Sequence, residues 1–268
     1  MTIQTIVISG AGGALGTAAV QILLGRGHQV FATDVEMASL TATAKRLCWD
    51  TKRLNLRELD VTSPEAWETL MVEVTAKGGL DLAIHCAGHI QGAPFWEQSA
   101  AEATRHLEVN ALGVYLGTAA AARVMVAQRR GHIMNIASMA GLMPSPGFAY
   151  YAGSKYAVRG FSLAAADELA EHGVAVTVVC PATIDTPMYS AQRDYYAQLQ
   201  GRLASPPMSM DAVVAAMLHS DVLEGRPREV HIPALKGAVA RGADLFPTVF
   251  SQLRRRLLGK SGSEDESP

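Results

Sequence analysis

The feature of this sequence that most limits its fold is a regular alternation of short apolar segments and longer helical ones. The apolar segments are rich in valine and isoleucine, as expected for strands that are buried on both faces. They are Ile3–Ser9, Gln29–Thr33, Arg53–Leu59, Asp81–Cys86, His132–Ala137, Ala175–Cys180 and Glu229–Ile232. The helical segments between them are Ala14–Arg26, Glu36–Cys48, Pro64–Lys77, Ala100–Arg129, Ala149–His172 and Met210–Leu223. This order predicts a doubly wound parallel sheet of about seven strands in a three-layer α/β/α fold.

Two segments depart from the alternation. Residues 186–207 contain Pro187 and a helical piece rich in tyrosine and glutamine, and we expect them to form a lid above the sheet. Residues 236–260 repeat apolar side chains at helical spacing, and Pro247 should divide them into two short helices. We expect residues 1–235 to form one domain, 236–260 to be a helical extension of it, and 261–268 to be disordered.

The composition excludes several classes of protein. The chain has 268 residues, of which 49% are hydrophobic, so it can bury a sizeable core. Its net charge of −2 gives no cationic field for nucleic acid. Three cysteines without metal-ligand spacing argue against a disulfide framework and against a zinc site. Because no run of 18 apolar residues and no cationic leader occur, we expect a soluble cytoplasmic protein without an integral membrane segment.

A glycine-rich turn follows the first expected strand. It reads Ser9-Gly10-Ala11-Gly12-Gly13-Ala14-Leu15-Gly16 and leads directly into a helix. Gly10 permits a tight turn, and Gly16 lets the helix pack closely on the sheet. The free amides at the helix start favour a diphosphate. A purely structural turn is the alternative, whereas an ATP-type loop is not expected because Gly-Lys-Ser/Thr is missing.

Asp34 ends the second expected strand, 18 residues after Gly16. A carboxylate at this place can accept hydrogen bonds from both ribose hydroxyls of adenosine, and it would repel a 2′-phosphate. Asp34 therefore favours NAD over NADP as the cofactor. Its alternative role is to cap the next helix.

Tyr151 and Lys155 carry the clearest catalytic signal. Their i, i+4 spacing places them on one face of a helix. A nearby ammonium should lower the pKa of the phenol, as an acid/base at neutral pH requires. Ser138, just past the fifth strand, is placed to bind the substrate oxygen. Asn110, inside a long helical segment, can bend the helix and hold a water next to Lys155.

From Ile3 to roughly Ile232, these motifs occur in an order and at spacings that resemble the short-chain dehydrogenase/reductase family, which has a Rossmann-type fold. The resemblance implies a tetrad. In it, Tyr151 is the acid/base and Ser138 orients the reacting oxygen. Lys155 binds the nicotinamide ribose and Asn110 holds a relay water.

The resemblance also implies a set of cofactor-binding residues. Asp60 and Val61 would flank adenine, and Ile184 and Thr186 would contact the nicotinamide amide. The full set is Gly10, Gly12, Gly13, Ala14, Leu15, Gly16, Asp34, Asp60, Val61, Ala87, Gly88, Tyr151, Lys155, Pro181, Ala182, Ile184 and Thr186.

Three residues depart from the family pattern. Ala14 replaces a glycine of the first turn, which should tighten the fit. Cys86 stands where the family has an asparagine that steadies the centre of the sheet, so stability there is in question. Ala182 replaces a glycine after Pro181 and constrains the backbone under the nicotinamide. None of these changes removes a reacting group.

Three loops at the carboxyl ends of the strands should supply the substrate pocket. Its expected residues are Ile90, Phe95, Trp96, Met139, Leu142, Met143, Phe148, Met188, Tyr189, Tyr195 and Tyr196. Arg193 is the only cationic residue of these loops, so the pocket suits a hydrophobic secondary alcohol or ketone, such as a steroid, aryl or terpenoid compound. The alternatives are an NADP-preferring reductase, a β-ketoacyl reductase and a non-catalytic cofactor sensor.

Other polar residues have more ordinary interpretations. Tyr150 is expected in the wall of the cleft, and His85 and His89 are not expected to form a metal pair. Residues 254–256 are three arginines beside Leu257 and Leu258. We favour a solvated helix face with a packing stripe over a contact with anionic membrane.

The two longest helical segments carry more apolar and small residues than one sheet face can cover. These residues are Ala111, Val114, Tyr115, Thr118, Ala122 and Met125 in the first, and Ala157, Phe161, Ala164, Ala165 and Leu169 in the second. The surplus should pair with a second subunit about a two-fold axis. The apolar stripe of residues 239–257 either adds a second interface or folds over the substrate mouth. We favour a homotetramer over a homodimer.

Overall fold

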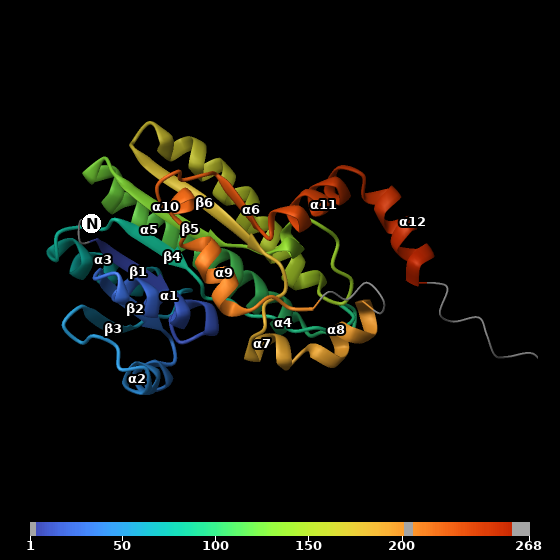
Figure 1. The fold of residues 1–268 in the computed structure, drawn as a ribbon, viewed down its shortest axis with the longest axis horizontal. Coiled ribbons are helices and arrows are strands. Elements are labelled where there is room, and N and C mark those ends of the chain that lie inside the picture. Colours follow the sequence, from blue (N-terminus) through green and yellow to red (C-terminus); the bar gives the residue numbers. More distant parts are fainter. Residues whose placement is uncertain (1–3, 201–205, 259–268) are drawn as a thin grey trace, which may run out of the picture.

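The computed structural model describes residues 4–200 and 206–258 (Figure 1). Its strands are β1 (Thr5–Ser9), β2 (Gln29–Asp34), β3 (Leu54–Glu58), β4 (Leu82–His85), β5 (Gly131–Ile136), β6 (Val174–Pro181) and β7 (Glu229–Ile232). They form one parallel sheet in the order β3-β2-β1-β4-β5-β6-β7. The predicted Rossmann-type sheet of seven strands is confirmed. The expected disordered segment 261–268 and residues 201–205 of the expected lid lie outside the described residues.

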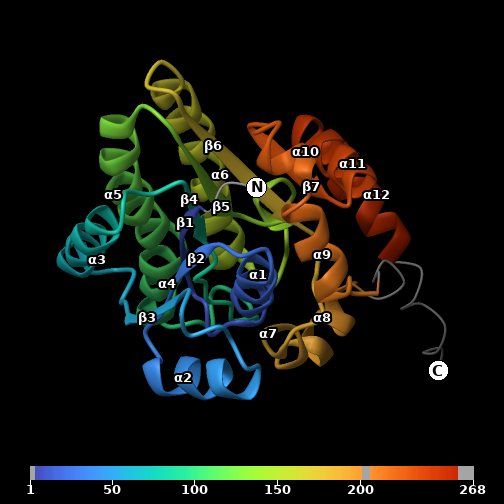
Figure 2. The same ribbon diagram turned by 60° about the vertical axis from the view of Figure 1, so that its left-hand side comes forward.

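Helices cover both faces of this sheet (Figure 2). The longer ones are α1 (Ala14–Gly25), α2 (Met37–Arg46), α3 (Pro64–Ala76), α4 (Ala100–Leu107), α5 (Gly113–Gln128), α6 (Ala149–Ala170), α8 (Arg193–Gln200) and α9 (Met210–Met217). Successive β1 residues point to opposite faces. Ile8 packs with α1, α2 and α9 in one core, and Val7 packs with α3, α5 and α6 in the other.

Strand order places a crevice at the carboxyl ends of β1 and β4. The chain runs from β1 outward to β2 and β3, and then returns to continue on the other side of β1 with β4. Loops that leave β1 and β4 therefore diverge to opposite sides. In open α/β sheets, ligands bind at such a switch point.

The expected helix Ala100–Arg129 is interrupted by a π-helical turn, Glu108–Leu112, between α4 and α5. Asn110 lies in this turn, and its side chain bonds to the backbone of the β4 loop instead of pointing along the helix. The expected helix Met210–Leu223 is likewise two helices, α9 and α10 (Ser220–Leu223). The cause is His219, which caps the start of α10.

The lid and the C-terminal extension contain short helices. After β6 come α7 (Pro187–Ser190) and α8, and after β7 come α11 (Ala234–Leu245) and α12 (Pro247–Leu258). The predicted division at Pro247 is confirmed, although the first of the two helices begins two residues earlier than Lys236. In Figure 1, α12 lies beyond α11 at the end of the molecule farthest from β3.

One helical run is long and apolar enough to cross a membrane. Residues 100–128 reach a mean hydropathy of 1.4 over an 18-residue window, but half of that window is buried inside the fold. Ala121 and Met125 of this run pack against the sheet. A core helix passes the same test, and we interpret the run as one.

Candidate active site

The glycine turn after β1 approaches the loop after β4 very closely. Gly10 has a φ of +69°, and a Cβ there would lie 2.5 Å from the backbone nitrogen of Ala87. A Cβ on Gly16 would lie 2.2 Å from the carbonyl oxygen of Gly10. Both positions thus require glycine. Helix α1 begins with no side-chain cap on its first amides, and Gly13, Ala14 and Leu15 line a cavity there.

Asp34 is held rigidly at the end of β2. Its Oδ2 accepts a hydrogen bond from the Gly12 amide at 2.9 Å, and its Oδ1 accepts one from the Glu36 amide at 3.1 Å. The alternative role of capping α2 is not met, because Glu36 is itself the N-cap residue of α2 and this helix has no side-chain cap. Each carboxylate oxygen keeps further acceptor capacity, and Asp34 lines the same cavity as α1.

Asp60 and Val61 lie on the next wall of this cavity. The Asp60 carboxylate accepts hydrogen bonds from the amide and the hydroxyl of Thr62, at 2.9 and 2.7 Å. The Val61 carbonyl accepts a bond from the buried Trp67 indole at 3.0 Å. These bonds fix the loop after β3 against the sheet.

Asn110 joins three parts of the site. Its Oδ1 accepts the His89 amide at 2.6 Å, and its Nδ2 donates to the His89 carbonyl at 2.8 Å and to Ser154 Oγ at 3.0 Å. Ser154 in turn donates to the Tyr151 carbonyl at 2.7 Å. Asn110 is fully buried, so these bonds position the loop after β4 against α6. The sequence did not point to Ser154. The only sign of its role is that a small polar residue stands on the inner face of a buried helix.

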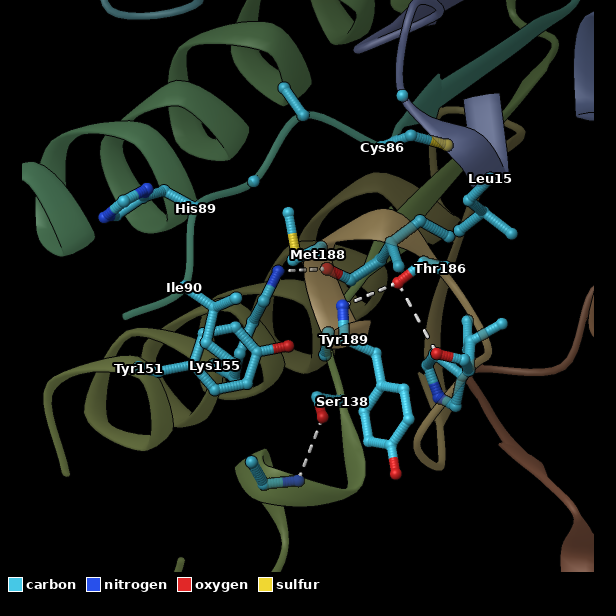
Figure 3. A pocket seen from close by; sticks show the side chains of 18 of the residues that line it. Leu15, Cys86, His89, Ile90, Ser138, Tyr151, Lys155, Thr186, Met188 and Tyr189 are labelled. Atoms are coloured by element: carbon cyan, nitrogen blue, oxygen red, sulfur yellow. Dashed lines mark hydrogen bonds between the residues drawn. The ribbon is translucent and has the colours of Figure 1, made fainter. Parts of the chain in front are cut away.

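Tyr151, Lys155 and Ser138 converge on the opposite wall (Figure 3). The Lys155 ammonium donates to the Ile136 carbonyl at 2.9 Å and lies 5.7 Å from the centre of the Tyr151 ring. The Ser138 hydroxyl accepts the Ala140 amide at 3.1 Å, which fixes it at the end of β5.

The pKa of the phenol differs from the expectation. Burial raises the pKa of Tyr151, and a hydrogen bond with Ser138 offsets only part of the rise. Burial also lowers the pKa of Lys155 to about 8, which weakens its charge near neutral pH. The expected lowering of the Tyr151 pKa by Lys155 is therefore not seen: burial dominates the shift, and the one group that lowers this pKa is Ser138.

Two of the expected site residues, Gly12 and Asn110, do not line the cavity of this site: the Gly12 amide holds Asp34, and the buried Asn110 holds the loop after β4. One cavity of about 1040 Å³ is lined by Gly10, Gly13, Ala14, Leu15, Gly16, Asp34, Asp60, Val61, Ser138, Tyr151 and Lys155. It also contains the expected residues Ala87, Gly88, Pro181, Ala182, Ile184, Thr186, Ile90, Met139, Met143, Phe148, Met188, Tyr189 and Tyr196. This volume lies at the upper end of the ~300–1,000 Å³ usual for small-molecule sites.

Comparison with known proteins agrees with this geometry. A family model described as short chain dehydrogenase matches residues 4–197. The 3-alpha-(or 20-beta)-hydroxysteroid dehydrogenase of Mycobacterium tuberculosis is 31% identical over 205 residues, or 76% of this chain and 78% of that protein.

The chain belongs to the short-chain dehydrogenase/reductase family.

Other members are similar to a comparable degree. The 3-oxoacyl-acyl-carrier-protein reductase of Vibrio cholerae is 31% identical over 71% of this chain and 78% of that protein. Among solved structures, a short-chain dehydrogenase from Streptomyces avermitilis has a TM-score of 0.79 at 20% identity, covering 98% of this chain and 100% of its own. An actinorhodin polyketide ketoreductase variant with NADPH has a TM-score of 0.77 at 24% identity, covering 86% and 95%. These two likenesses show the shared fold.

In this short-chain dehydrogenase, the centre of the sheet is steadied from β5. Asn135 accepts a bond from Thr118 at 3.1 Å and donates to Ser162 at 2.9 Å. His85 is buried against Trp67, and neither of its ring nitrogens has a hydrogen-bond partner among the described residues. Burial lowers the pKa of His85 to about 4 and raises that of Cys86 to about 12, so both groups are neutral.

Four residues expected in the substrate pocket do not line the cavity. Phe95 and Trp96 stack on each other at 5.2 Å and are exposed, because the loop after β4 turns outward before reaching them. Tyr195 packs against the edge of Phe148 at 5.7 Å and supports the wall from behind. Leu142 is fully buried beneath the cavity.

The cavity also includes residues outside the predicted set, among them Arg105 of α4, Thr183 and Gln192 near the lid, and Leu235 and Lys236 of α11. Val239 of α11 and Phe250 of α12 line it as well, in agreement with the expected alternative in which residues 239–257 fold over the substrate mouth. The place of the α11 residues in the site depends on how α11 packs on β7.

Polar clusters beside the cavity are satisfied within the protein. His89 does not meet His85; its ring bonds to Glu102, which also lies beside His106. Both nitrogens of His106 are used, one by the Glu102 carbonyl at 2.9 Å and the other by the Gln91 amide at 3.2 Å. A metal ion at this cluster would have to displace these bonds, so we do not propose one.

Proposed function

We propose that this protein is an NAD-dependent dehydrogenase/reductase that interconverts a hydrophobic secondary alcohol and its ketone. The observation that carries the proposal is one continuous cavity with Asp34 at one end and Tyr151, Ser138 and Lys155 at the other. Residues 4–235 would bind the dinucleotide and carry the catalysis. The sequence match to a hydroxysteroid dehydrogenase supports an apolar substrate.

The cofactor end suits an adenine dinucleotide. Backbone amides at the start of α1 would hold the diphosphate, and Asp34 would accept the ribose hydroxyls. When bound, NAD(H) supplies or accepts the hydride. The wall near Ile184 and Thr186 would hold the nicotinamide beside Tyr151.

Tyr151 would hold the proton that moves to or from the substrate oxygen. Because burial keeps the phenol protonated, it is a ready acid for ketone reduction. Ser138 would donate a second hydrogen bond to the same oxygen. Lys155, with a pKa near 8, can lose or regain a proton near neutral pH and so resupply Tyr151 through water held near Asn110.

The lining supports an apolar substrate. Met143, Phe148, Met188, Tyr189 and Val239 form most of the wall at the Tyr151 end. Met side chains adapt to irregular shapes. Residues 186–207 would act as a lid. Within this segment, Gln192 accepts the Gly92 amide at 3.0 Å and thereby ties α7 and α8 to the opposite loop.

A reductase of carrier-bound acyl chains is the second candidate. The observation that favours it is that Lys236 of α11 and Arg105 of α4 both line the cavity. An anionic carrier would need such cations at the entrance. Two exposed cations are a small basic entrance, so we rank this activity below the first.

Absorbance decay of NADH with a panel of hydrophobic ketones tests the proposed activity. Turnover of steroid-like or aryl ketones, and none with small hydroxy acids, is the expected result. A preference for a carrier-bound β-ketoacyl chain would instead establish the second candidate. No turnover with either class, combined with tight NADH binding, would indicate a cofactor sensor.

Cofactor preference is tested separately by calorimetric titration. We expect NADH to bind at least tenfold more tightly than NADPH, since the 2′-phosphate would meet Asp34. Asp34→Asn should remove most of this difference by raising NADPH affinity. Equal affinities in the unaltered protein would leave Asp34 only its structural bonds to the Gly12 and Glu36 amides.

We also propose that the α4–α5 and α6 faces pair with a second subunit. The structure buries Ala111, Val114, Thr118 and Met125 against its own fold, so the surplus is smaller than expected. What remains includes Leu107 and Leu112, which are exposed, and the half-buried stack of Tyr115 on Phe161 at 4.2 Å. A mass of two subunits by light scattering would support this pairing, and four subunits would require a second interface.

A further inference from the structure

The α11–α12 segment exposes an unusual amount of apolar surface. Leu245 is 74% exposed, and Phe246 and Val249 are each 64% exposed. With Leu235, Val239 and Leu253, they make up nearly half of the exposed large apolar side chains among the described residues. Surfaces of this kind mark interaction sites.

The same segment is also strongly basic. Residues 234–258 contain five cationic residues and one acidic residue, in a chain whose net charge is −2. Arg241 pairs with Glu229 at 3.4 Å. The other cations are Lys236 on α11 and the three consecutive arginines 254–256 on α12. A basic helix with an exposed apolar side is typical of helices that lie in the surface of an anionic membrane.

This apolar surface continues into the cavity. Leu235 and Val239 of α11 and Phe250 of α12 line the cavity, and the exposed Phe246 and Val249 lie on either side of Pro247 at the start of α12. Figure 2 shows α11 and α12 on the side of the molecule where α8 and α9 also lie. A surface that covered these helices would therefore lie next to the mouth of the site.

We propose that α11 and α12 form a docking surface for an anionic lipid membrane. The apolar side chains would insert among the acyl chains while the cations meet the headgroups. Docking would place the mouth of the cavity at the layer in which an apolar alcohol or ketone concentrates. Only this last consequence rests on the proposed function.

Two other occupants fit the surface less well. A second copy of the chain related by a two-fold axis would set the same basic segment against itself, so like charges would meet. The chain's own residues 261–268 are acidic and could attract the arginines, but they contain no large apolar side chain to cover Phe246 or Val249. An anionic membrane supplies both the apolar layer and the opposite charge.

Sedimentation of the full-length protein with vesicles tests the proposal without cofactor or substrate. The vesicles are phosphatidylcholine alone, or phosphatidylcholine with about one third phosphatidylglycerol. We expect binding to the anionic vesicles at low salt, with marked weakening at high salt. Replacing residues 254–256 by glutamine should weaken binding about 100-fold, since each basic side chain near an anionic surface contributes about fivefold.

The apolar contribution is tested with Phe246→Asp and Val249→Asp together. The pair should lower vesicle binding at least tenfold, while activity on a water-soluble ketone stays unchanged. Val72→Asp is the matched control, because Val72 is 71% exposed on α3 and should not affect binding.

Three results would overturn the proposal. One is unaltered protein that stays in the supernatant with anionic vesicles. A second is binding that survives the loss of Phe246 and Val249. The third is a protein that does not bind vesicles but self-associates in light scattering, and that loses this self-association with Phe246→Asp and Val249→Asp. Such a result would make the surface a contact between subunits. An inactive enzyme that still binds vesicles would refute the proposed function alone.

Discussion

The two ends of the cleft are built in different ways. At the cofactor end, backbone groups and buried side chains set the geometry, as in the contact of Gly10 with the β4 loop and the bond from the Gly12 amide to Asp34. At the substrate end, half-exposed side chains on short helices form the wall, such as Met188, which is 46% exposed, and Val239. Changes at the first end should therefore affect folding and every substrate. Changes at the second should affect only particular substrates.

The largest expected effect comes from Tyr151, which lines the cavity together with Ser138 and Lys155 at the end away from Asp34. Tyr151→Phe should lower kcat by at least ~10³-fold and leave NADH affinity nearly unchanged, because it removes only the acidic proton. Steady-state rates and NADH titration check both parts. Tyr150→Phe is the matched control, since the Tyr150 hydroxyl bonds to the Phe95 carbonyl at 3.2 Å, outside the proposed chemistry. A similar loss in both variants would argue against Tyr151 as the proton donor.

Acid stability should depend on the core beneath the cofactor end. Burial lowers the pKa of His85 from 6.5 to about 4, so the folded state keeps it neutral while the unfolded state gains a proton. The free energy of unfolding should then fall as the pH drops from about 6.5 to 4, by ~3 kcal/mol from this one group. His132, with a pKa lowered by burial to about 4, adds a fall of the same sign.

Urea unfolding across this pH range measures the effect. His85→Asn should flatten the dependence, because asparagine does not titrate. The same change at His172, which is exposed, should leave a curve parallel to that of the unaltered protein. If both variants kept the original slope, His85 would not be the group that takes up the proton.

The two ends of the cleft also differ in how well the sequence predicted them. The turn Gly10–Gly16, Asp34 and the pair Tyr151/Lys155 depend on local spacing and strand order, and the structure brings all of them to one cavity. Phe95 and Trp96 were placed wrongly, because the side of a loop that faces the cavity depends on contacts far away in the sequence. The same limit hid the bond between Asn110 and Ser154. The α11–α12 wall, in contrast, agrees with one of the two alternatives expected for residues 239–257, that of a segment folded over the substrate mouth.

The next largest effect on stability is expected from the close backbone packing at the cofactor end. Gly16→Ala should destabilise the protein by ~2 kcal/mol or more, because its Cβ would lie 2.2 Å from the Gly10 carbonyl oxygen. Gly153→Ala is the matched control. It is also a helical glycine, but its Cβ would meet nothing within 4 Å, so a gain of ~0.5–1 kcal/mol is expected there. Thermal unfolding of both variants measures the difference, and equal stabilities would mean that the turn can shift away from α1.

The smallest effect is expected at the substrate end. Met188→Ala should raise KM about tenfold for a bulky ketone, since it removes part of one apolar side chain from the wall. A small ketone that does not reach Met188 should keep its kcat/KM, and NADH affinity should not change. Stability should change little as well, because Met188 is 46% exposed and leaves no closed cavity behind. Rates with the two ketones, NADH titration and thermal unfolding together separate the ends of the cleft. A loss of NADH affinity or of stability in this variant would show that the lid and the cofactor end are coupled, and that the substrate wall is not built independently of the rest of the site.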